Sequence, residues 1–395
     1  MKGAASRRLK VRFMAVILFL MYLPAWSQPC YRVTPILPSS PKKGIVIPKA
    51  INDRGEVTGE LRTERDAIFV WSAQDGMRVP PMQFTGSNTF GCYAHAINNA
   101  GQVTGNCGVA ILGDVRQGIV ALKNDGRDVQ GDGSSINDAG KIVGHRAALN
   151  GGYEPFLYDP CCGMQPLMPH DAGGSVFARF INASGQVIGF DSTHNVPFVW
   201  LPESGVRYLD PAADASERAY ATALTDNGIV LLDVWREIDT TDDDPRRESY
   251  GFGQGISYST SEGPAAEATR PSYRIERHAY LYDIRSGQRS PIGHLPGGDE
   301  HTQGHNINRH EEVVGGSGTS QNAMRAFYWH PRSGMHQLDQ LIETNDPYNG
   351  IALHSALGIN AVGQILAIGV IDAKPFLLTP VQAIGCEAPR TWSVK

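Results

Sequence analysis

One phrase recurs seven times along this 395-residue chain, and it constrains the fold more than any other feature. The phrase is a hydrophobic residue and Asn, a turn that ends on Gly, and a short apolar strand, as in Ile97-Asn98-Asn99-Ala100-Gly101-Gln102-Val103. We call the Asn position the anchor; it is filled by Asn52, Asn98, Asn137, Asn182, Thr225, Asn308 and Asn360. A repeated unit of this kind cannot bury its apolar face alone and needs its neighbours. The repeat therefore predicts an array of similar, stacked units.

The spacing of the anchors indicates what each unit is. Consecutive anchors are 46, 39, 45, 43, 83 and 52 residues apart. A period of roughly 40–45 residues is typical of one four-stranded propeller blade. The long fifth interval predicts an insertion at about residues 236–277, which contains several Asp residues and then a Gly-, Ser- and Tyr-rich tract. This composition favours a loop that extends beyond the rim of the blade.

Each unit has the pattern of short strands. Asn-x-x-Gly suits a hairpin turn, because Asn bonds its own backbone and Gly accepts a positive φ. A strand built around an aromatic residue follows, as in Phe69-Val70-Trp71, and then a Gly turn and a third strand. In the second unit, Gly118-Ile119-Val120-Ala121-Leu122 stands where the aromatic strand is expected. No helical periodicity is visible after the N-terminus. We therefore predict an all-β fold, a β-propeller of about seven repeats of short antiparallel strands.

The two ends of the chain predict how the ring closes. The seventh unit lacks its last strand, while residues 31–36 form a strand with no anchor before it. Joining this N-terminal strand to the last blade would remove two exposed edges. It would also bring Cys30 near Cys386, and a disulfide there would clasp the ring. The alternative is that these two cysteines lie on separate tails.

The first 27 residues resemble a secretory signal peptide. Five basic residues precede an apolar run of about a dozen residues and the small-residue end Ala25-Trp26-Ser27. We predict cleavage near Ser27–Gln28, a single domain over 28–385, and a C-terminal tail over 386–395. The alternative is that the segment is not cleaved and holds the protein to the membrane at its N-terminus. The protein is thus expected to be secreted or periplasmic, with no membrane span after signal cleavage.

Six cysteines are an even number in a chain expected to be exported, where thiols tend to oxidise. Fifteen pairings are open. Cys92 and Cys107 flank a hairpin-sized stretch, and the adjacent Cys161 and Cys162 could bond to each other or elsewhere.

Charge and motifs exclude several functions. Without segment 1–27, 30 basic residues face 40 acidic ones, a net charge of −10, which argues against a nucleic-acid partner. No cofactor motif and no catalytic motif occurs, so no catalytic, cofactor-binding or metal residue is assigned. The segment Asp299-Glu300-His301, with His305 and His310, could hold a divalent metal, but its spacing matches no known metal motif and favours an inter-blade loop.

The best copy of the phrase also points to a known family. Ile307-Asn308, Val313-Val314-Gly315, Ala326-Phe327-Tyr328-Trp329 and Gly334-Met335 resemble the HAF family of probable extracellular repeats. The resemblance covers nearly all of residues 45–380 outside the insertion. It implies an exported propeller-like protein without assigned chemistry.

The sequence favours a non-catalytic binding or scaffold module for an extracytoplasmic protein or glycan. The alternatives are a propeller hydrolase or lyase with a site at one mouth of the central channel, and a purely structural part of a surface layer. Convergence of polar side chains with perturbed pKa values on one mouth would favour a site there.

Overall fold

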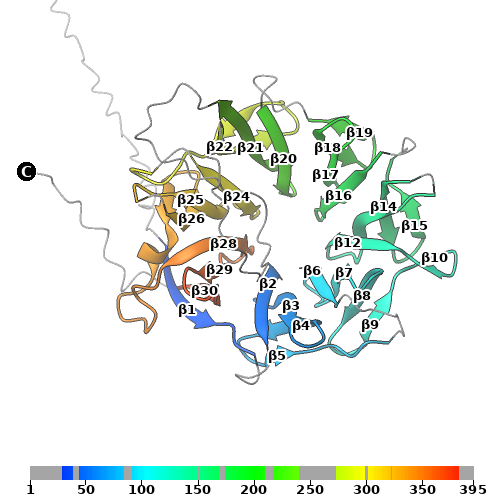
Figure 1. The fold of residues 1–395 in the computed structure, drawn as a ribbon, viewed down its shortest axis with the longest axis horizontal. Coiled ribbons are helices and arrows are strands. Elements are labelled where there is room, and N and C mark those ends of the chain that lie inside the picture. The colour runs from blue at the N-terminus through cyan, green and yellow to red at the C-terminus, as the bar shows by residue number, and fades with distance from the viewer. Residues whose placement is uncertain are drawn as a thin grey trace, which may run out of the picture.

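The computed structural model describes residues 29–38, 44–83, 91–149, 151–168, 174–209, 217–239, 273–298, 301–321 and 323–381. These residues form seven four-stranded antiparallel sheets that stand as blades around one axis (Figure 1). The predicted all-β propeller of seven repeats is therefore confirmed. In the described part of the chain the only helical segment is the short 3-10 helix η1 (Leu338–Leu341).

Blades 1 to 6 each use four consecutive strands, with the first strand innermost (Figure 1). Blade 1 contains β2 (Ile45–Ile51), β3 (Val57–Arg62), β4 (Ala67–Ser72) and β5 (Gly76–Arg78). Blade 2 contains β6 (Tyr93–Ile97), β7 (Val103–Asn106), β8 (Ala110–Asp114) and β9 (Gly118–Ala121). Blade 3 contains β12 (Gly131–Ile136), β13 (Ile142–Ala147), β14 (Tyr153–Asp159) and β15 (Gly163–Pro166). A small hairpin of β10 (Lys123–Asn124) and β11 (Arg127–Asp128) lies between blades 2 and 3 in the chain.

The remaining blades continue the same order. Blade 4 contains β16 (Val176–Ile181), β17 (Val187–Asp191), β18 (Val196–Leu201) and β19 (Gly205–Tyr208). Blade 5 contains β20 (Glu217–Leu224), β21 (Ile229–Asp239), β22 (Tyr273–Asp283) and β23 (Arg289–Pro291). Blade 6 contains β24 (Thr302–Ile307), β25 (Val313–Gly318), β26 (Met324–His330) and β27 (Gly334–Gln337). Blade 7 contains β28 (Leu353–Ile359), β29 (Ile365–Gly369), β30 (Pro375–Val381) and β1 (Cys30–Pro35).

Blade 7 closes the ring as the sequence predicts. β1 pairs antiparallel with β30, in a register that runs from Cys30 opposite Val381 to Pro35 opposite Phe376. Tyr31, Val33 and Ile36 are buried there. The N-terminal strand thus supplies the outermost strand of the last blade and covers the edge of β30.

The aromatic strand packs each blade against the one before it. Phe69 contacts a cluster that includes Leu366 and Leu377 of blade 7, and Phe327 lies in a cluster with Leu231 of blade 5. Both phenylalanines are fully buried. Because this contact repeats around the ring, the core is a set of inter-blade layers rather than one central cluster.

Two sequence expectations need correction. In blade 2 the aromatic-strand position belongs to β8, where Ile111 pairs with Gly105 as Phe69 pairs with Gly59 in blade 1. The segment Gly118–Ala121 is the outermost strand instead, because the connection after β7 is short.

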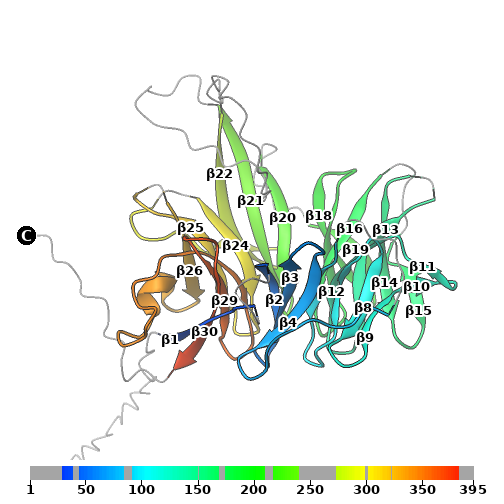
Figure 2. The same cartoon turned by 60° about the horizontal axis from the view of Figure 1, so that its bottom comes forward.

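The second correction concerns the predicted insertion 236–277. Its two ends are strands, since the ladder between β21 and β22 continues to the pair Asp239–Tyr273. This long hairpin rises above the ring in Figure 2. Residues 240–272 lie outside the described residues.

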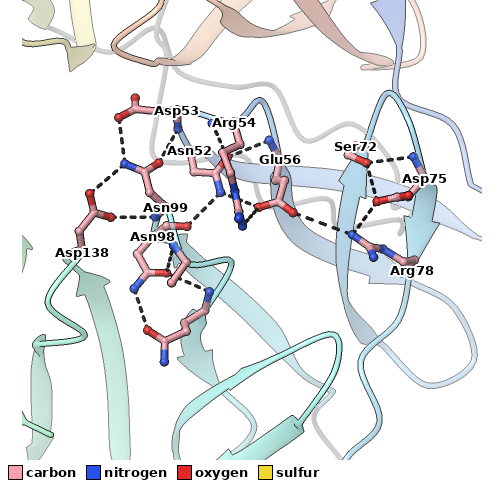
Figure 3. Close-up of polar contacts among 12 residues, drawn as sticks. Asn52, Asp53, Arg54, Glu56, Ser72, Asp75, Arg78, Asn98, Asn99 and Asp138 are labelled. Carbon is pink, nitrogen blue, oxygen red and sulfur yellow. Dashed lines mark hydrogen bonds and ion pairs between the residues drawn. The ribbon is translucent and has the colours of Figure 1, made fainter.

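The anchors link neighbouring blades. The side-chain amide of Asn52 donates to the backbone carbonyl of Asn98 at 2.9 Å (Figure 3). Asn98 donates in turn to the carbonyl of Asn137 at 3.0 Å. The same bond leads from Asn137 to Asn182, from Asn182 to Thr225, from Asn308 to Asn360 and from Asn360 back to Asn52. Each anchor therefore bonds the next blade, except Thr225, whose hydroxyl bonds Asn227 and Ile229 within its own turn.

Disulfides link described cysteines in two places. Cys92 bonds Cys107 across the first two strands of blade 2, and Cys161 bonds its neighbour Cys162 in the turn between β14 and β15. Cys30 is also disulfide-bonded. Its predicted partner, Cys386, lies outside the described residues. These bonds indicate an oxidising compartment outside the cytoplasm.

The part of the chain that the structure describes has no helix with the length and apolar character needed to cross a membrane.

Candidate functional site

The innermost strand of every blade carries a β-bulge at the same repeat position. The ladder between β6 and β7 shifts register between Ala94 and Ala96, so that His95 is the extra residue. The equivalent residue, three positions before each anchor, is Lys49, His95, Ser134, Arg179, Thr222, His305 or Leu357. A bulge redirects the extra side chain and is common next to binding sites. Unlike the anchors, these seven residues differ from blade to blade.

We call the end of the ring at which the innermost strands begin the entry end; the anchor turns lie at the opposite end. Two positions define it in each blade: the residue five before the anchor and its cross-strand partner on the second strand, eight after the anchor. In blade 3 these are Asp132 and His145, which pair directly between β12 and β13. Cross-strand partners share one face of a sheet.

His95 of blade 2 and Asp132 of blade 3 form a polar pair at the entry end. His95 Nε2 lies 3.1 Å from Asp132 Oδ2, and the ring of Tyr93 packs edge-on against His95 with centroids 5.1 Å apart. Asp132 is mostly buried, with 14% of its side chain exposed, whereas His95 is 33% exposed. The carboxylate of the pair is thus shielded, while part of the His95 imidazole is exposed to solvent.

Burial sets the protonation of this site. It lowers the pKa of His145, and the nearby Arg179 adds to this effect while Asp132 opposes it. His145 is therefore a neutral imidazole at neutral pH. Burial also raises the pKa of Tyr93, reinforced by the negative charges of Asp132 and Glu60, so that the phenol stays protonated and can donate.

Aromatic rings surround His145. The ring of Phe177 from blade 4 lies edge-on at 4.9 Å between centroids, and that of Tyr153 at 5.1 Å. The guanidinium of the exposed Arg179 lies over Phe177 at 5.8 Å. Tyr153 is itself exposed. The site therefore combines apolar ring faces with a carboxylate, two imidazoles and a cation.

The clearest mark of a site is a set of shielded polar atoms without partners. Among the described residues, five such side-chain atoms have no hydrogen bond. Four of them lie at the entry end, on blades 3 and 5; they are Asp132 Oδ1, His145 Nδ1, Asp233 Oδ1 and Arg277 Nε. Leaving such atoms unpaired costs folding free energy, on the order of 1–3 kcal/mol each, so a concentration of them calls for a ligand or another function.

The residues that the sequence singled out lie elsewhere or apart. The anchors are buried at the opposite end of the ring and are structural. There Asn99 bonds both Asp53 and Asp138, so that these carboxylates tie turns together (Figure 3). Among the residues considered as metal ligands from the sequence, Asp299 and Glu300 lie outside the described residues, and His310 is an exposed turn residue.

Two further groups bear on metal binding. His305 is the bulge residue of blade 6, and its Nδ1 donates to the carbonyl of Ala356 at 2.9 Å. Within the described ranges one other group could hold a metal ion, formed by Asp159, Cys161 and Cys162. These two sulfurs are bonded to each other and are not thiolate ligands.

Sequence reasoning missed His95, Asp132 and His145. A signal was present: aligning the units on their anchors shows that the positions five before, three before and eight after vary between blades, while the anchor hardly changes. Variable positions on a constant scaffold are where specificity is expected.

Comparison with known proteins identifies the fold. No family model matches the chain, and no curated protein does. Among solved structures, a streptogramin B lyase aligns with a TM-score of 0.50 and 10% identity over 89% of this chain and 98% of its own. An oligogalacturonate lyase in complex with manganese gives 0.50 and 12% over 89% and 93%, and one from Vibrio parahaemolyticus gives 0.52 and 9% over 89% and 97%. At these identities the likeness concerns the propeller fold alone.

Proposed function

We propose that this chain is an exported glycan-binding propeller whose site is the entry end around Asp132 and His145. One observation carries the proposal: Asp132 Oδ1 and His145 Nδ1 are shielded and unpaired, and the rings of Phe177 and Tyr153 pack against His145. A sugar offers hydroxyl groups to the polar atoms and apolar ring faces to the aromatic side chains. Binding sites commonly combine an aromatic lining with a few convergent polar groups.

A glycan array tests this proposal, followed by calorimetric titration of the best ligand. Asp132→Asn should weaken binding about 10-fold or more, because a hydrogen bond to a charged group is lost. Asp372→Asn is the matched control, since that carboxylate lies on an exposed turn after β29 and its side chain is 71% exposed. Absence of any glycan ligand, or equal affinity for the Asp132→Asn variant, would contradict the proposal.

We also propose that the chain belongs to the HAF repeats and reaches its compartment by a signal peptide. The oxidised cysteines support a location outside the cytoplasm. Intact-mass measurement of the exported protein should give an N-terminus at or near Gln28. A mature chain that still begins at Met1 would contradict cleavage.

A second function is favoured by the His95–Asp132 pair. A carboxylate that holds one nitrogen of an imidazole orients the other nitrogen as a general base, which is what a lyase or hydrolase requires. Incubation with the bound glycan should then release products, and His95→Gln should remove turnover while binding persists. If the glycan is unchanged after long incubation, the catalytic function is contradicted and only the binding function remains.

A further inference from the structure

Blade 5 repeats the arrangement of blade 3 with different residues. Asp233 is eight positions after Thr225, as His145 is eight after Asn137, and it pairs with Tyr220 as His145 pairs with Asp132. Because the two blades share one repeat geometry, Asp233 and His145 lie at the same level of the entry end. Blade 5 therefore places a second polar group on the same end of the ring.

Asp233 has a cationic neighbour on the next strand. Arg277 pairs with Trp235, two residues beyond Asp233, so the acid and the base are diagonal neighbours on one face of β21 and β22. Oδ1 of Asp233 and Nε of Arg277 are both shielded and have no hydrogen-bond partner. A ligand group that both donates and accepts hydrogen bonds at this place would supply the missing partner of each atom.

Blade 4 joins the two polar groups through aromatic contacts. Phe177 and Phe190 are cross-strand partners at the equivalent positions of β16 and β17. Phe177 contacts the ring of His145 at 4.9 Å, and Phe190 contacts that of Tyr220 at 4.5 Å. Blades 3, 4 and 5 thus form a continuous arc with polar atoms at both ends and aromatic rings between them.

We infer that Asp233 and Arg277 form a second subsite, which binds a vicinal diol of a sugar unit, and that the natural ligand is an oligosaccharide spanning blade 4. The carboxylate accepts a hydrogen bond from one hydroxyl, and the guanidinium Nε–H donates to the neighbouring hydroxyl oxygen. This inference rests on the proposed glycan function and adds the length and orientation of the ligand. A single sugar unit would fill only one end of the arc.

A chain-length series tests the inference. The probes are linear oligosaccharides of one to six units, in a β-1,4-glucose series, an N-acetylglucosamine series and a uronic acid series, titrated calorimetrically. The affinity of the unsubstituted protein should rise by about 10- to 100-fold once the ligand reaches the second subsite, as two paired polar groups predict. Asp233→Asn and Arg277→Gln should each remove most of this gain, while Asp132→Asn weakens ligands of every length.

The outcomes separate this inference from the proposed function. Equal affinity for short and long ligands, or an unchanged length gain in both blade 5 variants, would overturn the second subsite and leave the first intact. Equal weakening of all lengths by Asp233→Asn would also overturn it, since the two blades would then form one subsite. Failure of every probe to bind the unsubstituted protein would overturn the proposed function and this inference together. Thermal unfolding of each variant shows that a loss of affinity is not a loss of fold.

Discussion

Each anchor side chain performs two tasks with one amide group. Oδ1 of Asn98 accepts from the amides of Ala100 and Gln102 and shapes the turn, while Nδ2 donates to the carbonyl of Asn137 in the next blade. Asn is suited to both because its amide carries a donor and an acceptor. Thr225 retains the turn through a bond from the amide of Ile229 but cannot reach blade 6.

We predict that Thr225→Asn stabilises the protein. The new amide should donate to the carbonyl of Asn308, as the other anchors do, and add about 1 kcal/mol to the free energy of unfolding. Denaturant titration measures this gain. Thr225→Ser is the control, because it keeps the hydroxyl in the turn and should give no increase. An Asn variant no more stable than the Ser variant would show that blade 5 lies too far from blade 6 for the bond.

Asp233 should make stability depend on pH. Burial raises its pKa from 3.8 to about 6, although the charge of Arg277 opposes the shift. Since the folded-state pKa is above the unfolded one, this group's stabilisation is complete below pH 3.8 and is lost as the pH rises through about 6.

Asp233→Asn should therefore raise the free energy of unfolding at pH 8 by on the order of 2 kcal/mol and much less at pH 4. Parallel denaturant titrations at the two pH values check this, with Asp372→Asn as the exposed control. A variant that is less stable at pH 8 would mean that the charged carboxylate has a stabilising partner in the folded protein.

The turn role of the anchors was predictable from the sequence, but their inter-blade role was not. Asn-x-x-Gly identifies a turn because its hydrogen bonds lie within the turn itself. The bond from Asn98 to Asn137 spans 39 residues and depends on how two blades are placed. Asp132 and His145 were missed for the same reason, since their partners come from other strands.

Strand order was predicted better than strand limits. The aromatic strands were recognisable where Phe or Trp marks them, but blade 2 has Ile111 at this position and was misaligned by one strand. In the fifth unit, the predicted strand ends before the real one does. Arg236 and Glu237 are polar and give no apolar strand signal, yet they pair with Glu276 and Ile275 in the ladder. The bulges leave no mark in a single unit.

We predict that the hairpin of β21 and β22 tolerates loss of the residues between them. Replacing residues 240–272 with a short Gly-containing turn should leave the thermal midpoint nearly unchanged, because all eleven pairs from Ile229–Asp283 to Asp239–Tyr273 remain. Differential scanning calorimetry measures the effect. A broad or split transition would show that the removed residues contribute to the packing of a blade.

Ring closure is a long-range feature that the sequence did predict, because the two ends are incomplete in complementary ways. The seventh unit has one strand fewer than the others, and the N-terminal segment forms a strand that belongs to no unit. Counting the strands in each unit is therefore enough to predict closure, without knowing how any side chain packs. The entry end could not be inferred in this way, since it depends on which faces of blades 3, 4 and 5 come together.

We predict that β1 is required for closure and can be supplied separately. Removing residues 29–38 exposes the edge of β30 and deletes Tyr31, Val33 and Ile36 from the core, a loss of about 5–9 kcal/mol from three large apolar side chains. This is comparable to the whole stability of a typical domain, so cooperative unfolding should disappear.

A synthetic peptide of residues 29–38 should restore cooperative unfolding in a concentration-dependent way, as followed by calorimetry. The same peptide with Val33→Asp should fail, because that side chain faces the blade 7 core. Cooperative unfolding of the truncated chain without any peptide would show instead that the ring stays closed through inter-blade contacts alone.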